Sequence, residues 1–346
     1  MERLPVAVIG ASGYTGAELV RLLHGHPRVA LAGLYARRAA GDKIAAHFPQ
    51  FAGTLDGEYL HYDADAVARA AKVAFLALPH GEGIAAAKEL IERGLLVLDL
   101  SADFRLRSAA VYEQWYGAHG APELLAEARY GLVERHRHSF AGARLVAVPG
   151  CYPTATLLAL APLLDAHLIS PDGLIVDAKS GVSGAGRTPS LATHFAEAGE
   201  GVRAYKIADH RHTPEIEQEL ALACGKEVRL TFTPHLIPMS RGILSTCYAT
   251  PTDPSRERAD YLAALRTAYA HESFVTVLDR PPDTAHVRGS NRVQVSVFVD
   301  RRAHRVIAVG AIDNLIKGAA GQAIQCLNTI AGWPETEGLA SLAMFP

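Results

Sequence analysis

The amino-acid sequence predicts an α/β protein with a doubly wound parallel sheet in its first half and an α+β domain in its second half. In the first half, short β-branched apolar runs alternate with helical segments, as in parallel sheets covered by helices on both faces. A glycine-rich turn directly follows the first of these runs. The second half contains longer strands of alternating polarity, which are typical of antiparallel sheets. A length of 346 residues suits two domains.

Composition narrows the classes of function. The chain is 49% hydrophobic and 20% charged, and its net charge of -2 gives no sign of a nucleic-acid or membrane partner. Its four cysteines lie far apart without a C-x-x-C pair, which fits neither a disulfide framework nor a zinc site. The sequence shows no signal peptide and no apolar run long enough to span a bilayer. We therefore expect a soluble, cytoplasmic protein.

The first strand is expected at Val6–Ile9, and a helix is expected from Ala17 to Leu23. The turn between them reads GASGYTG, with G-x-x-G-x-x-G spacing. Strand, glycine turn and helix together present backbone N–H groups to a phosphate. Tight strand-to-helix turns also need glycine without any ligand, but the position after a first strand favours a nucleotide site. The candidate cofactor-binding residues here are Gly10, Ser12, Gly13, Tyr14, Thr15 and Gly16.

The segment after the second strand, Val29–Tyr35, indicates which nucleotide binds. An NAD site usually has an acidic residue there, to bind the ribose 2′-hydroxyl. This sequence has Arg37 and Arg38 instead. Guanidinium groups suit a 2′-phosphate, so we expect NADP rather than NAD. The alternative is a solvated basic turn.

Two more strand–helix units continue the pattern. A strand at 73–78 leads into Pro79, a helix is expected at 84–93, and a strand at 95–100 ends at Ser101. Ligands in such sheets bind beyond the carboxyl ends of the strands, so Pro79 and Ser101 join the candidate cofactor site. Residues 105–144 are less periodic and are interpreted as an excursion before the next strand.

A short apolar strand at 145–148 is broken by Pro149 and Gly150, and Cys151 follows. A helix is expected from Pro153, because proline is tolerated in a first helical turn. Cys151 would then lie at a helix N-terminus, where orphan N–H groups and the helix dipole lower a thiol pKa. Cys151 is therefore the candidate nucleophile. The alternative is an inert buried cysteine.

The second half adds two polar segments. A strand at 174–179 enters a glycine-rich stretch in which Ser180, Ser183 and Arg187 would suit an anion, although a flexible loop is equally compatible. Further on, His210 and His212 lie just ahead of a helix with Thr213 as the expected N-cap. A neutral imidazole there would exchange protons with a thiol and a substrate oxygen. Solvated loop histidines are the alternative, and no histidine has metal-site spacing.

The remaining segments are expected to form mostly sheet. Strands are predicted at 228–233 and 241–248, and a hairpin at 292–299 and 306–312. Helices are predicted near 255–270 and 317–330. Long antiparallel strands in a second domain commonly build a subunit interface, so an oligomer is expected.

With these residues in view, the whole chain resembles the N-acetyl-γ-glutamyl-phosphate reductases, a family related to the aspartate-semialdehyde dehydrogenases. The resemblance is carried by GASGYTG, SADFR, PGCYPTAT, SGVSGAGR, HRHTPEI, FTPHL, RGIL and DNLIKGAAGQA. It implies a Rossmann-type NADP domain at 1–149 and 314–346, with the final helix packing back. It also implies a catalytic and oligomerisation domain of the semialdehyde dehydrogenase type at 150–313.

The resemblance further implies a reaction and its site residues. N-acetyl-L-glutamyl 5-phosphate would be reduced by NADPH to the 5-semialdehyde with release of phosphate, in arginine biosynthesis. Cys151 would be the nucleophile, and the HRH segment would supply the acid/base, with His210 and His212 both open. Asn314 would join the NADP(H) site. Candidates for the substrate are Arg105, Ser180, Gly181, Arg187 and Arg241. We expect a homodimer or homotetramer and no metal.

Two alternatives remain open at this point. One is the related reductase that acts on a carrier-protein-bound aminoadipyl phosphate in lysine biosynthesis. That enzyme shares several motifs but lacks the PGCYPT and SGVSGAGR forms found here. The other alternative is a non-catalytic NADP-sensing protein in which Cys151 is inert.

Overall fold

The computed structural model describes residues 3–345, and these fold into two compact units. The first unit runs to Pro149 and resumes at Ala319–Ala340, and the second comprises Gly150–Gly318 and the residues from Ser341 onward. The return to the first unit thus comes later than residue 314, where the sequence-based division places it. The reason is that the Asn314 side chain is still bonded to the second unit, accepting from the Gly242 N–H at 2.8 Å.

The first unit contains a six-stranded sheet of order β2-β1-β3-β4-β6-β5, with every neighbouring pair parallel. Its strands are β1 (Leu4–Ile9), β2 (Val29–Tyr35), β3 (Val73–Leu76), β4 (Leu96–Asp99), β5 (Arg129–Tyr130) and β6 (Leu145–Ala147). The central strands are buried on both faces, since Val6, Ala7 and Val8 are all fully buried. This double burial explains the continuous apolar runs of the sequence.

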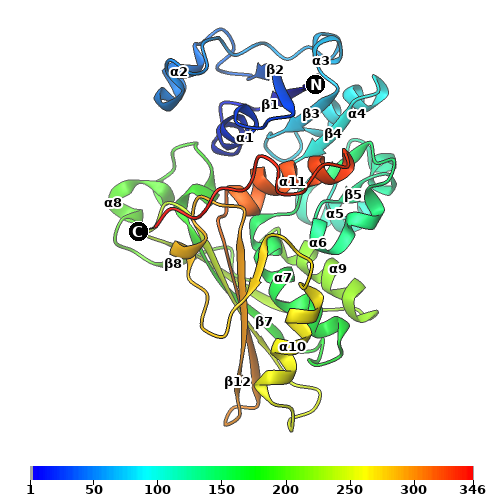
Figure 1. Cartoon of the computed structure of the whole chain (residues 1–346), viewed down its shortest axis with the longest axis vertical. Coiled ribbons are helices and arrows are strands. Elements are labelled where there is room, and N and C mark those ends of the chain that lie inside the picture. Colours follow the sequence, from blue (N-terminus) through cyan, green and yellow to red (C-terminus); the bar gives the residue numbers. More distant parts are fainter. Residues whose placement is uncertain (1–2, 346) are drawn as a thin grey trace. The chain divides into compact units, whose positions relative to one another are not determined.

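Helices cover both faces of this sheet (Figure 1). The α-helices are α1 (Tyr14–His24), α2 (Ile44–His47), α3 (Ala64–Ala70), α4 (Ile84–Glu92), α5 (Ala109–Tyr116), α6 (Val133–His136) and α11 (Gly321–Ile330). Helix α1 packs against α11, and α3 packs against α4. A buried hydrogen bond of 3.0 Å between His26 and Asn328 ties α11 to the segment after α1. The C-terminal helix therefore belongs to the first unit.

The excursion at 105–144 contains more structure than its weak periodicity predicts. It holds α5, α6 and β5 as well as short 3₁₀ turns at Pro122–Ala126 and Arg137–Phe140. A third 3₁₀ turn in this unit spans Pro49–Phe51. These elements are too short for an amphipathic pattern to show in the sequence.

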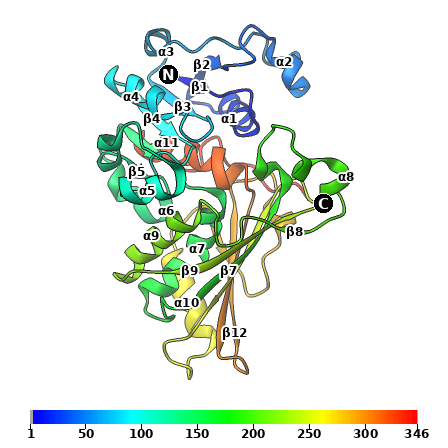
Figure 2. The ribbon, with the colours of Figure 1, turned by 180° about the vertical axis from the view of Figure 1, so that it is seen from behind.

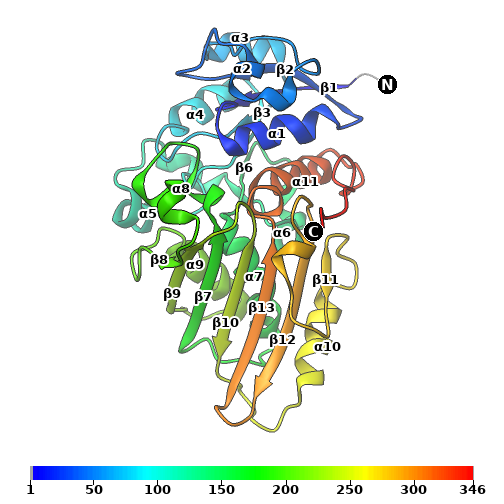
Figure 3. The same cartoon turned by 90° about the vertical axis from the view of Figure 1, so that its left-hand side faces the viewer.

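The second unit contains a mixed seven-stranded sheet of order β11-β12-β13-β10-β7-β9-β8 (Figure 3). Its strands are β7 (Leu174–Gly181), β8 (Arg203–Ala204), β9 (Leu230–Ile237), β10 (Ile243–Ala249), β11 (Val275–Val277), β12 (Val293–Asp300) and β13 (Arg305–Ile312). The predicted hairpin is confirmed, because β12 and β13 pair antiparallel. Strand β9 continues through Pro234 to Ile237 rather than ending at Thr233.

The helices α7 (Cys151–Asp165), α9 (Thr213–Cys224) and α10 (Arg258–Ala268) pack against this sheet, as the view from behind also shows (Figure 2). The short helix α8 (Phe195–Ala198) lies in the connection between β7 and β8. Further 3₁₀ turns span Val182–Ala185, Leu191–Thr193 and Thr284–His286, and a π-helical turn, η7, spans Ile316–Ala320. Within residues 3–345, no helix combines the length and apolar character needed to cross a membrane.

Two helix starts differ from the sequence-based expectation. Helix α7 begins at Cys151 itself, with Gly150 as its N-cap, so proline occupies its third position. Helix α9 has His212 as its N-cap, and Thr213 is its first residue. Cys151 and His212 are thus each placed at the N-terminus of a helix.

Candidate active site

The glycine turn after β1 forms a compact link into α1. Gly10 has a φ of +87°, and a Cβ atom there would lie 2.3 Å from the Ala77 carbonyl oxygen. A Cβ atom on Gly16 would lie 2.3 Å from the Gly10 carbonyl oxygen. Gly13 is the N-cap of α1, so no side chain caps this helix. The N-terminus of α1 is therefore suited to a phosphate group, and Ser12, Tyr14 and Thr15 belong to the same turn.

Arg37 and Arg38 are both exposed in the segment that follows β2. The Arg37 guanidinium lies 3.4 Å from the Glu82 carboxylate, and its side chain is 83% exposed. An ion pair this exposed contributes little free energy, so Arg37 can exchange it for a phosphate. Both arginines fit the 2′-phosphate that distinguishes NADP from NAD.

The turn after β3 rests on buried acidic residues that the sequence pattern does not single out. Pro79 is exposed, whereas Ser101 is buried and its hydroxyl donates to the Asp99 carboxylate at 2.7 Å. The Asp103 carboxylate accepts from the Gly81 N–H at 2.8 Å and from the Tyr112 hydroxyl at 2.9 Å. Ser101 therefore belongs to the buried hydrogen-bond network on which the turn after β3 rests.

Asp99 and Asp103 are both fully buried. Burial, and secondarily the charge of Asp103, raises the pKa of Asp99 to about 7. A buried carboxyl group with a near-neutral pKa, such as that of Asp99, is unusual outside functional sites. Asp99 is thus a titrating group next to the turn after β3, a segment that is expected to bind the cofactor.

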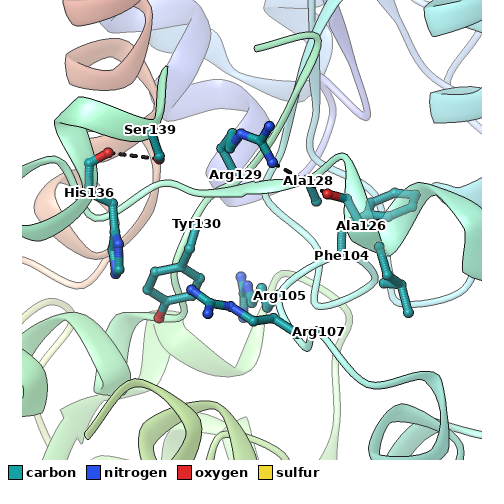
Figure 4. Close-up of a pocket in the computed structure, with 10 residues that line it drawn as sticks. Phe104, Arg105, Arg107, Ala126, Ala128, Arg129, Tyr130, His136 and Ser139 are labelled. Carbon is teal, nitrogen blue, oxygen red and sulfur yellow. Dashed lines mark hydrogen bonds between the residues drawn. The ribbon is translucent and has the colours of Figure 1, made fainter. Parts of the chain in front are cut away.

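Arg105 lines a cavity of about 390 Å³ within the first unit (Figure 4). The walls of this cavity are Phe104, Arg105, Arg107, Leu125, Ala126, Ala128, Arg129, Tyr130, His136 and Ser139. The Arg105 side chain donates to the carbonyl oxygens of Val148 at 2.7 Å and Leu100 at 2.8 Å. Arg105 therefore fixes the backbone where β4 and β6 end, in addition to any role toward a substrate anion.

Cys151 is the first residue of α7 and is partly exposed. All four cysteines are thiols. Cys247 is fully buried, and burial raises its pKa to about 12, so it is an inert core residue. Cys326 is also fully buried, and Cys224 lies at the other end of a helix. Only Cys151 combines exposure with a helix N-terminus, which favours a thiolate.

Gly150, the residue before the thiol, is in contact with two side chains of α9. A Cβ atom on Gly150 would lie 2.4 Å from the His212 Nε2 atom. The Gly150 N–H donates to the Glu215 carboxylate at 2.8 Å. His212 is thus placed beside the residue that precedes Cys151, and Glu215 is a buried site residue that sequence reasoning missed.

His210 lies in an aromatic enclosure next to His212. Its ring is 4.8 Å from the His212 ring and 5.5 Å from the rings of both Tyr152 and Tyr205. Burial, with smaller contributions from nearby cationic side chains, lowers the pKa of His210 to about 4. His210 is therefore neutral at physiological pH, and its Nδ1 atom accepts from the His212 N–H at 3.1 Å.

The tyrosines of this enclosure are linked to one another. The Tyr205 hydroxyl donates to the Tyr152 hydroxyl at 3.2 Å. Burial raises the pKa of Tyr205 to about 12, and burial also raises the pKa of Tyr152. Both remain protonated at neutral pH, so they are hydrogen-bond donors beside the thiol rather than bases.

The expected anion-binding residues of the second unit gather at one end of its sheet. Ser180 on β7 pairs with Ile243 on β10, which pairs with Ile312 at the end of β13. The Asn314 side chain accepts from the Gly242 N–H and donates to the Ser183 hydroxyl at 3.0 Å. Asn314 thus joins two loops, those that carry the candidates Arg187 and Arg241.

These substrate candidates differ in exposure. Ser180 is buried and donates to the Gly181 carbonyl, and a Cβ atom on Gly181 would lie 2.8 Å from the Ser240 carbonyl oxygen. Arg241 is 27% exposed and lies 3.7 Å from the buried Asp313 carboxylate. Arg187 is exposed. Arg187 and Arg241 are therefore the candidates able to meet an anion, and Ser180 and Gly181 shape the loop.

Comparison with known proteins defines the class. Residues 5–143 match the family "Semialdehyde dehydrogenase, NAD binding domain", and residues 151–314 match "Semialdehyde dehydrogenase, dimerisation domain". Aspartate semialdehyde dehydrogenase II from Vibrio cholerae has the same fold, with a TM-score of 0.72 at 16% identity over 96% of this chain and 99% of that one. The corresponding enzyme with NADP from Candida albicans has a TM-score of 0.71 at 18% identity, over 95% of this chain and 97% of that one. The chain is an oxidoreductase of the semialdehyde dehydrogenase class.

Full-length relatives define the family within that class. N-acetyl-gamma-glutamyl-phosphate reductase from Rhodospirillum rubrum is 52% identical over 352 residues, covering 100% of this chain and 99% of that protein. The protein of the same name from Magnetococcus marinus is 51% identical over 348 residues and 99% of each chain. The chain belongs to the N-acetyl-gamma-glutamyl-phosphate reductase family.

Proposed function

We propose that this chain reduces N-acetyl-L-glutamyl 5-phosphate to N-acetyl-L-glutamate 5-semialdehyde and phosphate, in arginine biosynthesis, through a thioester on Cys151. The observation that carries this proposal is the placement of Cys151, the one partly exposed cysteine at a helix N-terminus, beside His212. Family membership supplies the identity of the substrate.

The first unit has the features of an NADP domain, and we assign it that role. The α1 N-terminus, with Gly10, Gly13 and Gly16, would hold the pyrophosphate, and Arg37 and Arg38 would hold the 2′-phosphate. Bound NADPH supplies the hydride that reduces the acyl carbon. Asn314, from the second unit, remains a candidate for this cofactor site.

The second unit would supply the covalent chemistry. The Cys151 thiolate attacks the acyl carbon, a carbon–sulfur bond forms, and the carbon–oxygen bond to phosphate breaks. After reduction of the thioester, the thiohemiacetal releases the aldehyde and restores the thiolate. His212 is the better placed histidine to take and return protons, because its Nε2 atom adjoins Gly150. His210 is neutral and enclosed, which suits a supporting role.

We also propose that two copies associate through the face of the seven-stranded sheet opposite α7. This face bears Ile175, which is 38% exposed, and a depression of about 460 Å³ that includes Asp177 and Tyr248. Its place in a dimerisation domain supports a homodimer, or a homotetramer built from such dimers. The thiol state of the cysteines and the biosynthetic role support a cytoplasmic location.

Replacement of Cys151 by serine tests the mechanism. We expect phosphate-dependent formation of NADPH from the semialdehyde to disappear, while NADPH still binds with near wild-type affinity by fluorescence titration. Turnover should be lost because an ester on serine is a poor hydride acceptor. NADPH binding should be retained because it does not require the thiol. Turnover at the wild-type rate would exclude the thioester.

The same assay separates the remaining alternatives. A carrier-protein-dependent reductase would turn over only the carrier-bound aminoadipyl substrate and leave the free N-acetylated semialdehyde unchanged. A non-catalytic sensor would bind NADPH and turn over neither substrate.

A further inference from the structure

Glu215 is a buried carboxylate that the proposed chemistry does not use. It lies in the first turn of α9 and is 1% exposed. Its Oε1 atom accepts the hydrogen bond from Gly150, the N-cap of α7. Removing a carboxylate from water costs several kcal/mol unless it gains partners, so a carboxylate retained here calls for an explanation.

His212 and Glu215, both at the N-terminus of α9, contact the same residue, Gly150. They occupy the N-cap and the third position of α9, and side chains three residues apart share a helix face. The His212 Nε2 atom adjoins the Cα side of Gly150, and the Glu215 Oε1 atom adjoins its N–H. The dimensions of one residue limit the separation of these two atoms to roughly 8 Å. The carboxylate charge therefore acts on both the imidazole and the neighbouring thiol.

We propose that Glu215 is a positioning residue that fixes Gly150 before the nucleophile and whose negative charge increases the proton affinity of Cys151 and His212. This inference deepens the proposed function, since it takes Cys151 as the reacting group. The carboxylate occupies the Gly150 N–H, so this N–H is not a donor for a developing oxyanion. A protonated His212 near neutral pH is the form able to donate a proton to that oxygen.

Other charged or titratable groups lie on the elements that carry Cys151, His212 and Glu215, or on segments next to these elements. These groups stay constant when Glu215 alone is changed. They are Tyr152 on α7; Tyr205, Lys206, His210 and Arg211 ahead of α9; Glu219 on α9; and Asp313 and Lys317 after β13. A difference between wild type and a Glu215 variant therefore reports the charge of Glu215.

The test compares Glu215→Gln with wild type in the full chain. Glutamine keeps an oxygen acceptor for Gly150 but removes the charge. Iodoacetamide alkylation of Cys151 is followed from pH 5.5 to 9 by peptide mass spectrometry, without substrate or cofactor. We expect the midpoint of reactivity to fall by about one pH unit, so that Cys151 reacts about tenfold faster at pH values below both midpoints. The partly exposed Cys224, measured in the same digest, is the internal reference.

Glu217→Gln is the matched control. Glu217 lies on the same helix and its carboxylate also accepts a backbone N–H, from Leu230 at 3.0 Å. We expect this variant to leave the Cys151 profile unchanged. A Glu215→Gln profile that superimposes on wild type, or an equal shift in both variants, would overturn the inference.

Glu215→Asp keeps the test decisive if the glutamine variant does not fold, as judged by circular dichroism. Aspartate keeps the charge and withdraws the acceptor, so turnover should fall while the alkylation midpoint stays near that of wild type. A midpoint that drops by a full unit would contradict the role of the charge. A chain that shows the expected shifts but no phosphate-dependent turnover would refute the proposed function alone.

Discussion

Gly318 lies directly against Cys151, and a Cβ atom on Gly318 would be 2.7 Å from the Cys151 Cβ atom. Gly318 belongs to the π-helical turn η7, which begins just after Asp313 caps the N–H groups of Leu315 and Ile316. Such π-helical turns occur frequently at functional sites. The contact brings the segment after β13 to the N-terminus of α7, so glycine is required here for close approach.

Gly318→Ala should therefore disturb Cys151, the proposed nucleophile, more than the fold. The added methyl group must displace Cys151 or the turn, and a shift of about 1 Å in a reacting group costs on the order of 100-fold in rate. We expect kcat to fall by about 10- to 100-fold while the far-ultraviolet circular dichroism spectrum is unchanged. Gly25→Ala is the control, because the nearest atom to a Cβ there is 3.8 Å away. A kcat within twofold of wild type would show that the site accommodates the methyl group.

The choice between NADP and NAD can be tested at Arg37 and Arg38. Both side chains are exposed at the carboxyl end of β2, and the double variant Arg37→Ala/Arg38→Ala removes two positive charges there. Each charged hydrogen bond to a phosphate is worth about 1.5–3 kcal/mol, so Kd for NADPH should rise at least tenfold. Kd for NADH should change less than twofold in the same fluorescence titration. Equal weakening of both nucleotides would contradict the assignment of the 2′-phosphate site.

Local sequence patterns predicted the elements that depend on neighbouring residues. The apolar runs located β1 to β4, and the Pro149–Gly150 break located the start of α7 within two residues, because buried strands and helix starts leave a local signal. The glycine turn was predicted for the same reason. Its tight backbone contacts with Ala77 are the physical basis of that signal.

The sequence did not predict which polar groups support the site. Glu215 binds Gly150 across 65 positions of sequence, and Asp103 binds Gly81 across 22. Ser101 was expected to face the cofactor but is buried against Asp99. Contacts of this kind depend on where separate elements meet, and no periodicity records them. The choice between His210 and His212 was open for the same reason, since only the three-dimensional structure separates the enclosed ring from the one beside Gly150.

His210 should not titrate in the physiological range. Its pKa is lowered to about 4 by burial, so the ring is neutral above that pH and is charged only in strong acid. Its Nδ1 atom accepts from the His212 N–H, which places the proton of the neutral ring on Nε2. We expect the ¹³Cε1 resonance of His210 to stay constant between pH 5.5 and 8, with the urea-unfolded chain titrating near pH 6.5 as the reference. A titration midpoint above pH 6 would show that the enclosure is wetter than the structure indicates.

Asp99 should make the stability of the first unit decrease as the pH rises. Burial raises its pKa to about 7 from an unfolded value near 3.8, so between these values the folded unit binds a proton that the unfolded chain has released. The contribution of this proton is complete below pH 4 and is lost as the pH rises toward 7. Asp99→Asn keeps an oxygen acceptor for Ser101 but removes the titration.

Tryptophan fluorescence is a suitable measurement, because both tryptophans of the chain, Trp115 and Trp333, lie in the first unit. Urea unfolding at pH 5 and pH 7.5 should show the wild type losing about 1–2 kcal/mol more unfolding free energy over this interval than Asp99→Asn. The slope is diagnostic, since a salt-bridged carboxylate with a lowered pKa would be ionised in both states across this interval and would change the stability only below about pH 4. Parallel losses in the two proteins would mean that Asp99 is already ionised at pH 5.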